Sequence, residues 1–346
     1  MKDRTERAAA TTTLEARETA PWTRHHVLDL DDFSVDEIET VMQTTEAMKE
    51  VLGREVPRVP ALRGRTIITL FYEASTRTRA SFELAGKALG ADVINVAAGG
   101  SSVEKGESLI DTVRTLQAIG ADVLVMRHGS SGAPYLVARN VHAAVVNAGD
   151  GWHAHPTQAL LDLYTMRTHL GDLRGRRVVI VGDIAHSRVA RSNIWGLSAM
   201  GAQVVVCAPP TLLPAAIGVR AGLQPARPQR PDTNEQLALP PVEVETSLDR
   251  AIEGADVVMA LRLQQERMSS GLLPSLREYA TLYQVNEERL ARANTGALVM
   301  HPGPMNEGIE ISSAVAGSLQ SVIEEQVTNG VAVRMAVLYL LARRRS

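Results

Sequence analysis

Five consecutive polar residues, Ser75-Thr-Arg-Thr-Arg79, follow an apolar run and precede a helical pattern. Backbone N–H groups at the start of a helix have no partner within the helix, and the helix dipole favours negative charge there. Hydroxyl groups and a guanidinium at the same position supply further donors that suit phosphate oxygens. We therefore predict a phosphate-binding helix N-terminus at this segment. The alternative, an N-cap beside solvated arginines, would need fewer polar residues.

Basic and polar side chains also follow most of the other apolar runs of the chain. They are Arg127-His128, Asp150 with His153, His155 and Gln158, Gly182-Asp183 with His186-Ser187-Arg188, Arg262 with Gln264 and Arg267, and His301-Pro-Gly-Pro304. In open α/β sheets, ligands bind outside the carboxyl ends of the strands. Because guanidinium groups keep their charge at physiological pH, this set of residues predicts a single cleft that binds anions.

His153 and His155 are the residues that most resemble a metal site. No Asp, Glu or Cys at a typical ligand spacing completes such a site, so we predict no metal ion. A neutral His155 held beside arginines would instead donate a hydrogen bond to a substrate carbonyl. A structural histidine at a domain joint is the alternative interpretation.

Two glycine-containing segments bear on cofactor binding. Val178–Gly182, followed by Asp183, looks like the first strand of a dinucleotide-binding fold, but only one of the three fingerprint glycines is present. A Gly-x-x-x-x-Gly-Lys-Ser/Thr loop is also missing from the sequence. We therefore predict no cofactor. The segment Gly99–Gly106, which carries Lys105, is interpreted either as a solvent-exposed loop or as a loop that reaches a ligand.

Composition narrows the class of protein. The 346 residues carry a formal net charge of −3, which argues against a nucleic-acid or membrane-surface partner, because both need positive surface. A single cysteine, Cys207, excludes a disulfide framework and indicates a cytoplasmic protein. Residues 1–20 lack the apolar region of a signal peptide and are expected to be a disordered tail. The sequence contains no apolar run of about 18 residues, so we predict no membrane span.

Short β-branched runs alternate with helical patterns along the chain. Strands are expected at 66–72, 92–96, 122–126, 143–147, 177–181, 203–207, 256–261 and 297–300, and helices at 78–89, 108–119, 158–170, 189–200 and 319–343. The capping box Ser34-Val-Asp-Glu37 begins a further helix. This alternation predicts an α/β protein of two domains, each a parallel β-sheet flanked by helices.

The two groups of strands divide near residues 149–156, but periodicity does not show which half the final helix joins. The expected limits are residues 21–157 with 322–346 for one domain and 158–321 for the other, joined by interdomain helices. Residues 209–241 hold 8 of the 16 prolines, so this segment is expected to be a proline-rich insertion in the second domain.

The segment Phe71-Tyr-Glu-Ala-Ser-Thr-Arg-Thr-Arg79 resembles the carbamoyl-phosphate signature of the aspartate and ornithine carbamoyltransferases. Four further segments follow in the order and spacing of the aspartate branch: Val125-Met-Arg127-His, His155-Pro-Thr-Gln158, Leu261-Arg-Leu-Gln264 and His301-Pro-Gly-Pro304. The resemblance extends from about residue 24 to the C-terminus. It does not extend to the N-terminal tail, to residues 209–241, or to Asn306-Glu307, where many relatives carry an arginine.

The resemblance implies a role for each matching residue. Ser75, Thr76, Arg77 and Thr78 would bind the phosphate of carbamoyl phosphate. Thr78, Arg127 and His155 would contact its carbonyl oxygen, and Gln158 its amide. L-aspartate would be held by Arg188, Arg262 and Gln264, with the backbone around Gly303 and Pro304. Ser101 and Lys105 would reach the site of a neighbouring subunit, and Glu73 would pair with Arg188 and Arg267.

The resemblance also implies an assembly and an activity. It implies a homotrimer with shared active sites that transfers a carbamoyl group to L-aspartate in pyrimidine biosynthesis, without a metal or cofactor. A dodecamer with regulatory chains and an assembly with dihydroorotase both stay open. An ornithine-type enzyme is the alternative, but that branch carries His-Cys-Leu-Pro where this chain has His301-Pro-Gly-Pro304. A catalytically silent scaffold is the other alternative, and the full set of arginines argues against it.

Overall fold

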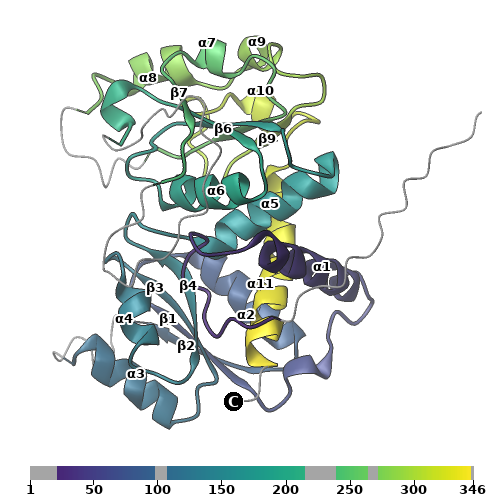
Figure 1. Cartoon of the computed structure of the whole chain (residues 1–346), viewed down its shortest axis with the longest axis vertical. Coiled ribbons are helices and arrows are strands. Elements are labelled where there is room, and N and C mark those ends of the chain that lie inside the picture. The colour runs from purple at the N-terminus through teal and green to yellow at the C-terminus, as the bar shows by residue number, and fades with distance from the viewer. Residues whose placement is uncertain (1–21, 98–106, 215–238, 264–271, 344–346) are drawn as a thin grey trace, which may run out of the picture.

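The protein forms two parallel β-sheets, one in each half of the molecule, with helices on their faces (Figure 1). The structure is a computed structural model that describes residues 22–97, 107–214, 239–263 and 272–343. The strand order is β2-β1-β3-β4 in one sheet and β7-β6-β5-β8-β9 in the other. Every pairing between neighbouring strands of these sheets is parallel. The predicted fold class is therefore confirmed.

The first sheet is built from the N-terminal half of the chain. Its strands are β1 (Thr66–Phe71), β2 (Asp92–Ala97), β3 (Val123–His128) and β4 (Ala144–Asp150), with helices α2 (Thr76–Ala88), α3 (Leu109–Ala118) and α4 (Ala133–Ala138). All seven residues of β4 are buried. A strand covered on both faces needs apolar side chains on both, which explains the near-continuous apolar runs in the sequence.

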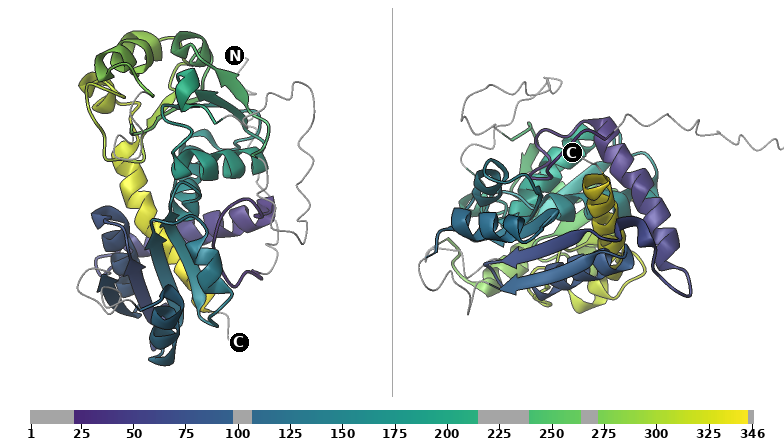
Figure 2. Two further views of the ribbon diagram at one scale, coloured as in Figure 1. Left: turned by 90° about the vertical axis from the view of Figure 1, so that its left-hand side faces the viewer. Right: turned by 90° about the horizontal axis from the view of Figure 1, so that it is seen from below.

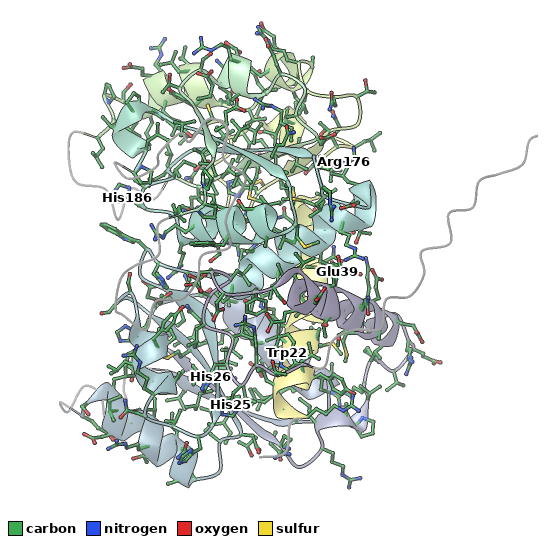
Figure 3. The ribbon with its side chains drawn as sticks, in the orientation of Figure 1. Trp22, His25, His26, Glu39, Arg176 and His186 are labelled. Atoms are coloured by element: carbon green, nitrogen blue, oxygen red, sulfur yellow. The ribbon has the colours of Figure 1, made fainter. Side chains whose placement is uncertain are left out.

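The second sheet follows in the chain. Its strands are β5 (Arg177–Val181), β6 (Gln203–Cys207), β7 (Glu243–Glu245), β8 (Val257–Ala260) and β9 (Leu298–Met300). Its helices are α6 (Arg188–Ala199), α7 (Leu248–Ala251), α8 (Leu276–Tyr283), α9 (Glu287–Leu290) and α10 (Ser313–Ala316). Arg176 and His186, which precede and follow β5, lie on opposite sides of the molecule in Figure 3. The carboxyl end of this sheet therefore faces the side of His186.

Two helices connect the two halves, α5 (Pro156–Leu170) and α11 (Ile323–Ala342), and α1 (Val35–Leu52) packs against both of them. Helix α11 packs against α1, α2 and α5, and Figures 1 and 2 show it running from one half into the other. The predicted capping box of α1 is present, because Ser34 and Glu37 each accept from the other's backbone N–H. Helix α11 returns to the first sheet although it follows the second in sequence.

The observed elements differ from the predicted ones at several ends. Strands β3 and β4 were expected to end at 126 and 147, but they continue to His128 and Asp150, which pair across a register shift. Arg127 therefore lies within a strand rather than in the loop after it. Strand β7 and the helices α4, α7, α8, α9 and α10 were not predicted, because elements of three to eight residues are too short to show a period. Of the described helices, none is long and apolar enough to cross a membrane.

Candidate active site

A cavity of about 430 Å³ lies at the carboxyl ends of both sheets. Among the residues that line it are eleven of the predicted site residues: Ser75, Thr76, Arg77, Thr78, Arg127, His155, Gln158, Arg188, Arg262, Gly303 and Pro304. They come from both halves of the chain, as ligand binding at strand ends requires. The other three predicted residues, Ser101, Lys105 and Gln264, lie outside the described residues, as does Arg267.

The N-terminus of α2 forms one wall of the cavity. Its N-cap residue, Ser75, makes no capping hydrogen bond with its side chain, and the first turn contains no acidic residue. The first intrahelical bond runs from the N–H of Arg79 to the carbonyl of Ser75, at 3.1 Å. The N–H groups of Thr76, Arg77 and Thr78 precede this bond and point out of the helix end. This wall therefore offers backbone donors, hydroxyls and the helix dipole to an anion.

The Arg77 guanidinium lies against the backbone of Gly303, in the segment that follows β9. Gly303 has φ +60, and a Cβ atom at this position would overlap the guanidinium. Its N–H donates to Nδ1 of His301 at 2.8 Å, and its peptide bond to Pro304 is cis. The backbone conformation therefore favours glycine here, and a side chain at this position would displace the arginine.

Arg127 and Arg188 share one carboxylate across the two halves. Nη2 of Arg188 donates to Glu73 Oε2 at 2.9 Å, and Nε of Arg127 lies 3.4 Å from the same oxygen. The expected pair of Glu73 with Arg188 is therefore present, and the contact with Arg127 is one that the sequence did not predict. Gly149 lies between the guanidinium groups, where a Cβ would be 3.0 Å from Cζ of Arg188 and 3.2 Å from Nη1 of Arg127.

His155 is a neutral donor or acceptor rather than a cation. It is the N-cap residue of α5, only 5% exposed, and its backbone N–H donates to Ser192 Oγ at 2.9 Å. Burial lowers the pKa of His155 far below its usual value, and Arg127, Arg188 and Arg334 lower it further. A neutral imidazole beside these arginines can donate to a carbonyl oxygen without adding charge.

His301 is neutral for similar reasons. Burial lowers its pKa to about 3, and the charges of Arg77 and Arg262 contribute. Because its Nδ1 accepts from the N–H of Gly303, the ring proton is on Nε2. His301 therefore orders the Gly303 segment beside Arg77.

Arg334, on α11, is a charged lining residue that the sequence did not predict. It is 5% exposed and lines the cavity together with Arg77. Burial lowers its pKa to about 10; attraction to Asp162 opposes this change and repulsion from Arg77 adds to it. The available signal was a single charge within the apolar stretch 331–342. A lone arginine in a buried helix needs a partner, and here an anion in the cavity could provide it.

The described residues contain no group of three or more His, Cys, Asp or Glu side chains that could hold a metal ion. Nδ1 of His153 lies 3.2 Å from Asp150 Oδ2, and its Nε2 lies 3.6 Å from Asp29 Oδ2. His153 is therefore paired with buried carboxylates. His155, by contrast, lines the cavity.

The charge of the lining defines what the cavity can bind. Its described residues include five arginines, Arg77, Arg127, Arg188, Arg262 and Arg334, and no aspartate or glutamate. Guanidinium groups and helix N-termini recognise phosphates and carboxylates. Two parallel sheets that present such donors at a shared cleft define a two-domain α/β enzyme for anionic substrates.

Comparisons with known proteins identify the family. The model described as "Aspartate/ornithine carbamoyltransferase, carbamoyl-P binding domain" matches residues 25–168. The model described as "Aspartate/ornithine carbamoyltransferase, Asp/Orn binding domain" matches residues 174–341. The chain belongs to the aspartate/ornithine carbamoyltransferase family.

Individual relatives are similar over nearly the whole chain. The "Aspartate carbamoyltransferase catalytic subunit" of Roseiflexus sp. (strain RS-1) is 61% identical over 319 residues, which are 92% of this chain and 95% of the relative. The aspartate transcarbamoylase of Trypanosoma cruzi, solved with carbamoyl phosphate and aspartate, is 27% identical with a TM-score of 0.77, covering 94% and 99% of the two chains. The catalytic subunit of M. jannaschii aspartate transcarbamoylase is 32% identical with a TM-score of 0.74, covering 92% and 98%.

Proposed function

We propose that this chain is the catalytic chain of an aspartate carbamoyltransferase. It transfers the carbamoyl group of carbamoyl phosphate to the amine of L-aspartate, giving N-carbamoyl-L-aspartate and phosphate for pyrimidine biosynthesis. The observation that carries this proposal is the cavity with anion donors on walls from both halves of the chain. The names of the relatives at about 60% identity support the choice of aspartate.

The phosphate of carbamoyl phosphate binds at the N-terminus of α2. The N–H groups and hydroxyls of Ser75, Thr76 and Thr78 donate to its oxygens, together with the guanidinium of Arg77. Arg334 lies beside Arg77 and provides a second full charge for the dianion. The two guanidinium groups match the two negative charges of the dianion, and the helix N-terminus adds a partial positive charge, which favours the phosphate over an uncharged leaving group.

The carbonyl oxygen of the carbamoyl group is bound by Thr78, Arg127 and His155. These donors stabilise the negative charge that develops on this oxygen when the amine attacks. Loss of a single donor of this type costs about 10²–10³ in kcat in other enzymes. The amide of Gln158, one turn further along α5, contacts the carbamoyl NH₂.

L-aspartate is held by the second half of the chain. Arg188 and Arg262 bind its two carboxylates, and the backbone at Gly303 and Pro304 contacts it as well. Gln264, which the resemblance assigns to the same substrate, lies outside the described residues. Glu73 fixes the guanidinium of Arg188 through the 2.9 Å hydrogen bond described above.

The reaction needs no covalent intermediate on the protein. The neutral amine of aspartate attacks the carbonyl carbon, a C–N bond forms, and the bond from that carbon to the phosphate oxygen breaks. The amine loses one proton, which the departing phosphate can accept. Holding both charged reactants in one cavity supplies much of the rate enhancement.

Product formation from two amines tests this proposal. The purified chain should form a ureido product from carbamoyl phosphate with L-aspartate and not with L-ornithine. A preference for L-ornithine would replace the assignment with an ornithine-type enzyme. Failure with both amines, in a chain that still binds carbamoyl phosphate, would favour the scaffold alternative.

The family resemblance extends the proposal to assembly and location. The chain forms a cytoplasmic homotrimer in which Ser101 and Lys105 enter the site of a neighbouring subunit, and its two domains have the limits given above. Mixing Lys105→Ala chains with His155→Ala chains should restore part of the activity, because some mixed sites contain both native residues. Mixed trimers without any recovered activity would contradict shared sites. Size-exclusion mass measurement of the chain alone and in its native lysate distinguishes a trimer from the larger assemblies.

A further inference from the structure

Asp162 is a fully buried carboxylate that has no role in the reaction described above. It lies on α5 one turn after Gln158, with 0% of its surface exposed. Its two oxygens accept hydrogen bonds from three side-chain amides on three helices. The donors are Gln158 Nε2 at 3.0 Å, Gln326 Nε2 at 2.8 Å and Asn193 Nδ2 at 2.8 Å.

A carboxylate imposes an orientation on each amide that it contacts. An ionised carboxylate is an acceptor only, so each amide must turn its NH₂ group toward Asp162. Burial raises the pKa of Asp162 to about 6, while the three amides and the charge of Arg334 oppose this change. The group is therefore ionised at neutral pH. Arg334, on α11, is the charged side chain that faces it among the described residues; the donors from α6 and α11 are neutral.

Gln158 is the amide whose orientation depends most on Asp162. Asn193 Nδ2 also donates to the carbonyl of Val189 at 3.1 Å, and Gln326 Oε1 also accepts from the N–H of His301 at 3.0 Å. These additional hydrogen bonds hold the side-chain amides of Asn193 and Gln326 in their orientations even without Asp162. Gln158 lines the cavity, and its carbonyl oxygen is the end left to face a ligand there.

The orientation of Gln158 matters because a carbamoyl group carries an NH₂ group, which is a donor and needs an acceptor. We propose that Asp162 is a positioning residue that holds the carbonyl of Gln158 toward the cavity and thereby selects carbamoyl phosphate over acyl phosphates that lack the NH₂ group. This inference rests on the proposed function. With the reverse orientation, Gln158 would present its own NH₂ group to that of the substrate, and two donors would face each other.

Acetyl phosphate is the probe for this selection, because a methyl group replaces the NH₂ group and the phosphate is unchanged. Dissociation constants for carbamoyl phosphate and acetyl phosphate are measured by calorimetry without aspartate, and their ratio is the selectivity. Asp162→Asn offers Gln158 both a donor and an acceptor, so the amide can be held either way round. We expect the selectivity to fall several-fold, up to about tenfold, which is the loss of one hydrogen bond.

A double-mutant cycle separates positioning from a general structural role. Gln158→Met removes the acceptor and should abolish most of the selectivity. In that background, Asp162→Asn should cause no further loss of selectivity, because the residue through which it acts is gone. Thr165→Val is the matched control: it removes another buried polar group from α5, one that accepts from Asn329 at 3.0 Å, and should leave the selectivity unchanged.

The selectivities of these variants support or overturn the positioning role of Asp162. Equal losses of selectivity in both backgrounds, or a folded Asp162→Asn variant with wild-type selectivity, would overturn it. If that variant does not fold, the wild-type protein provides the test, because selectivity should fall as the pH is lowered through about 6 and Gln158→Met should show no such change. Because Gln158→Met binds the same two phosphates, comparing its pH profile with that of the wild type removes the effect of phosphate ionisation. A wild-type chain that binds both phosphates but makes no carbamoyl aspartate would instead refute the proposed function.

Discussion

Replacing Gly303 by alanine should displace the phosphate-binding guanidinium of Arg77 without removing any functional group. A Cβ atom at position 303 would overlap that guanidinium. The backbone of Gly303 has φ +60, where an L-residue costs about 1–2 kcal/mol. The variant therefore carries two separate penalties: a backbone penalty on folding and a steric penalty on the position of Arg77.

The two penalties predict different measurements. The backbone term should lower the free energy of unfolding by about 1–2 kcal/mol, as measured with urea. Displacement of Arg77 should cost a charge-assisted hydrogen bond to phosphate, about 1.5–3 kcal/mol, which corresponds to about a 10- to 150-fold rise in the KM for carbamoyl phosphate. Adding Arg77→Ala to Gly303→Ala should then raise this KM little further.

Gly296 provides a matched control in the same region of the chain. It has φ +82, and a Cβ atom there would meet nothing within 4 Å. Gly296→Ala should therefore lose similar stability while its KM for carbamoyl phosphate stays at the wild-type value. Equal KM values for the two alanine variants would show that Gly303 does not hold Arg77 in its functional position, and the reasoning would be refuted.

Three further outcomes follow from the site. Glu73→Gln removes the carboxylate that Arg127 and Arg188 share. Urea unfolding should show a loss of about 1–3 kcal/mol in the free energy of unfolding, less than for a fully buried ion pair because the Glu73 side chain is 25% exposed. Burial and the neighbouring arginines hold the pKa of the His155 imidazole well below its usual value. NMR should therefore show it still neutral at the pH where an ordinary histidine is half protonated, and a protonation midpoint near 6.5 would contradict this. Arg77→Ala should chiefly raise the KM for carbamoyl phosphate and Arg262→Ala that for aspartate, so identical kinetic profiles would argue against separate subsites.

The anion-binding cleft could be predicted from the sequence because its donors occur in short contiguous segments. Each of these donors lies at or beside the end of a strand or the beginning of a helix; they are Ser75, Arg127, His155, Arg188 and Arg262. The carboxyl ends of parallel strands meet at one edge of a sheet, so local patterns were enough to bring these residues together.

The residues that could not be predicted act through contacts between distant segments. Arg334 and Asp162 lie on α11 and α5, two helices buried on most sides, whose sequences show no amphipathic period. Without a period, neither helix reveals which face meets the cavity. The contact of Glu73 with Arg127 also depends on tertiary packing, because the two residues lie 54 positions apart in the sequence.

The charge distribution explains why a chain with a net charge of −3 binds two anions. Burial and like charges lower the pKa of Arg77, and the neighbouring charge responsible is Arg262, from the opposite half of the chain. Burial lowers the pKa of Arg334, and repulsion from Arg77 adds to this effect. Guanidinium groups cannot relieve such repulsion by losing a proton at physiological pH. A phosphate dianion held by Arg77 and Arg334 would turn the repulsion between these two guanidinium groups into attraction. Part of the binding free energy therefore comes from unfavourable charge that the fold has already assembled.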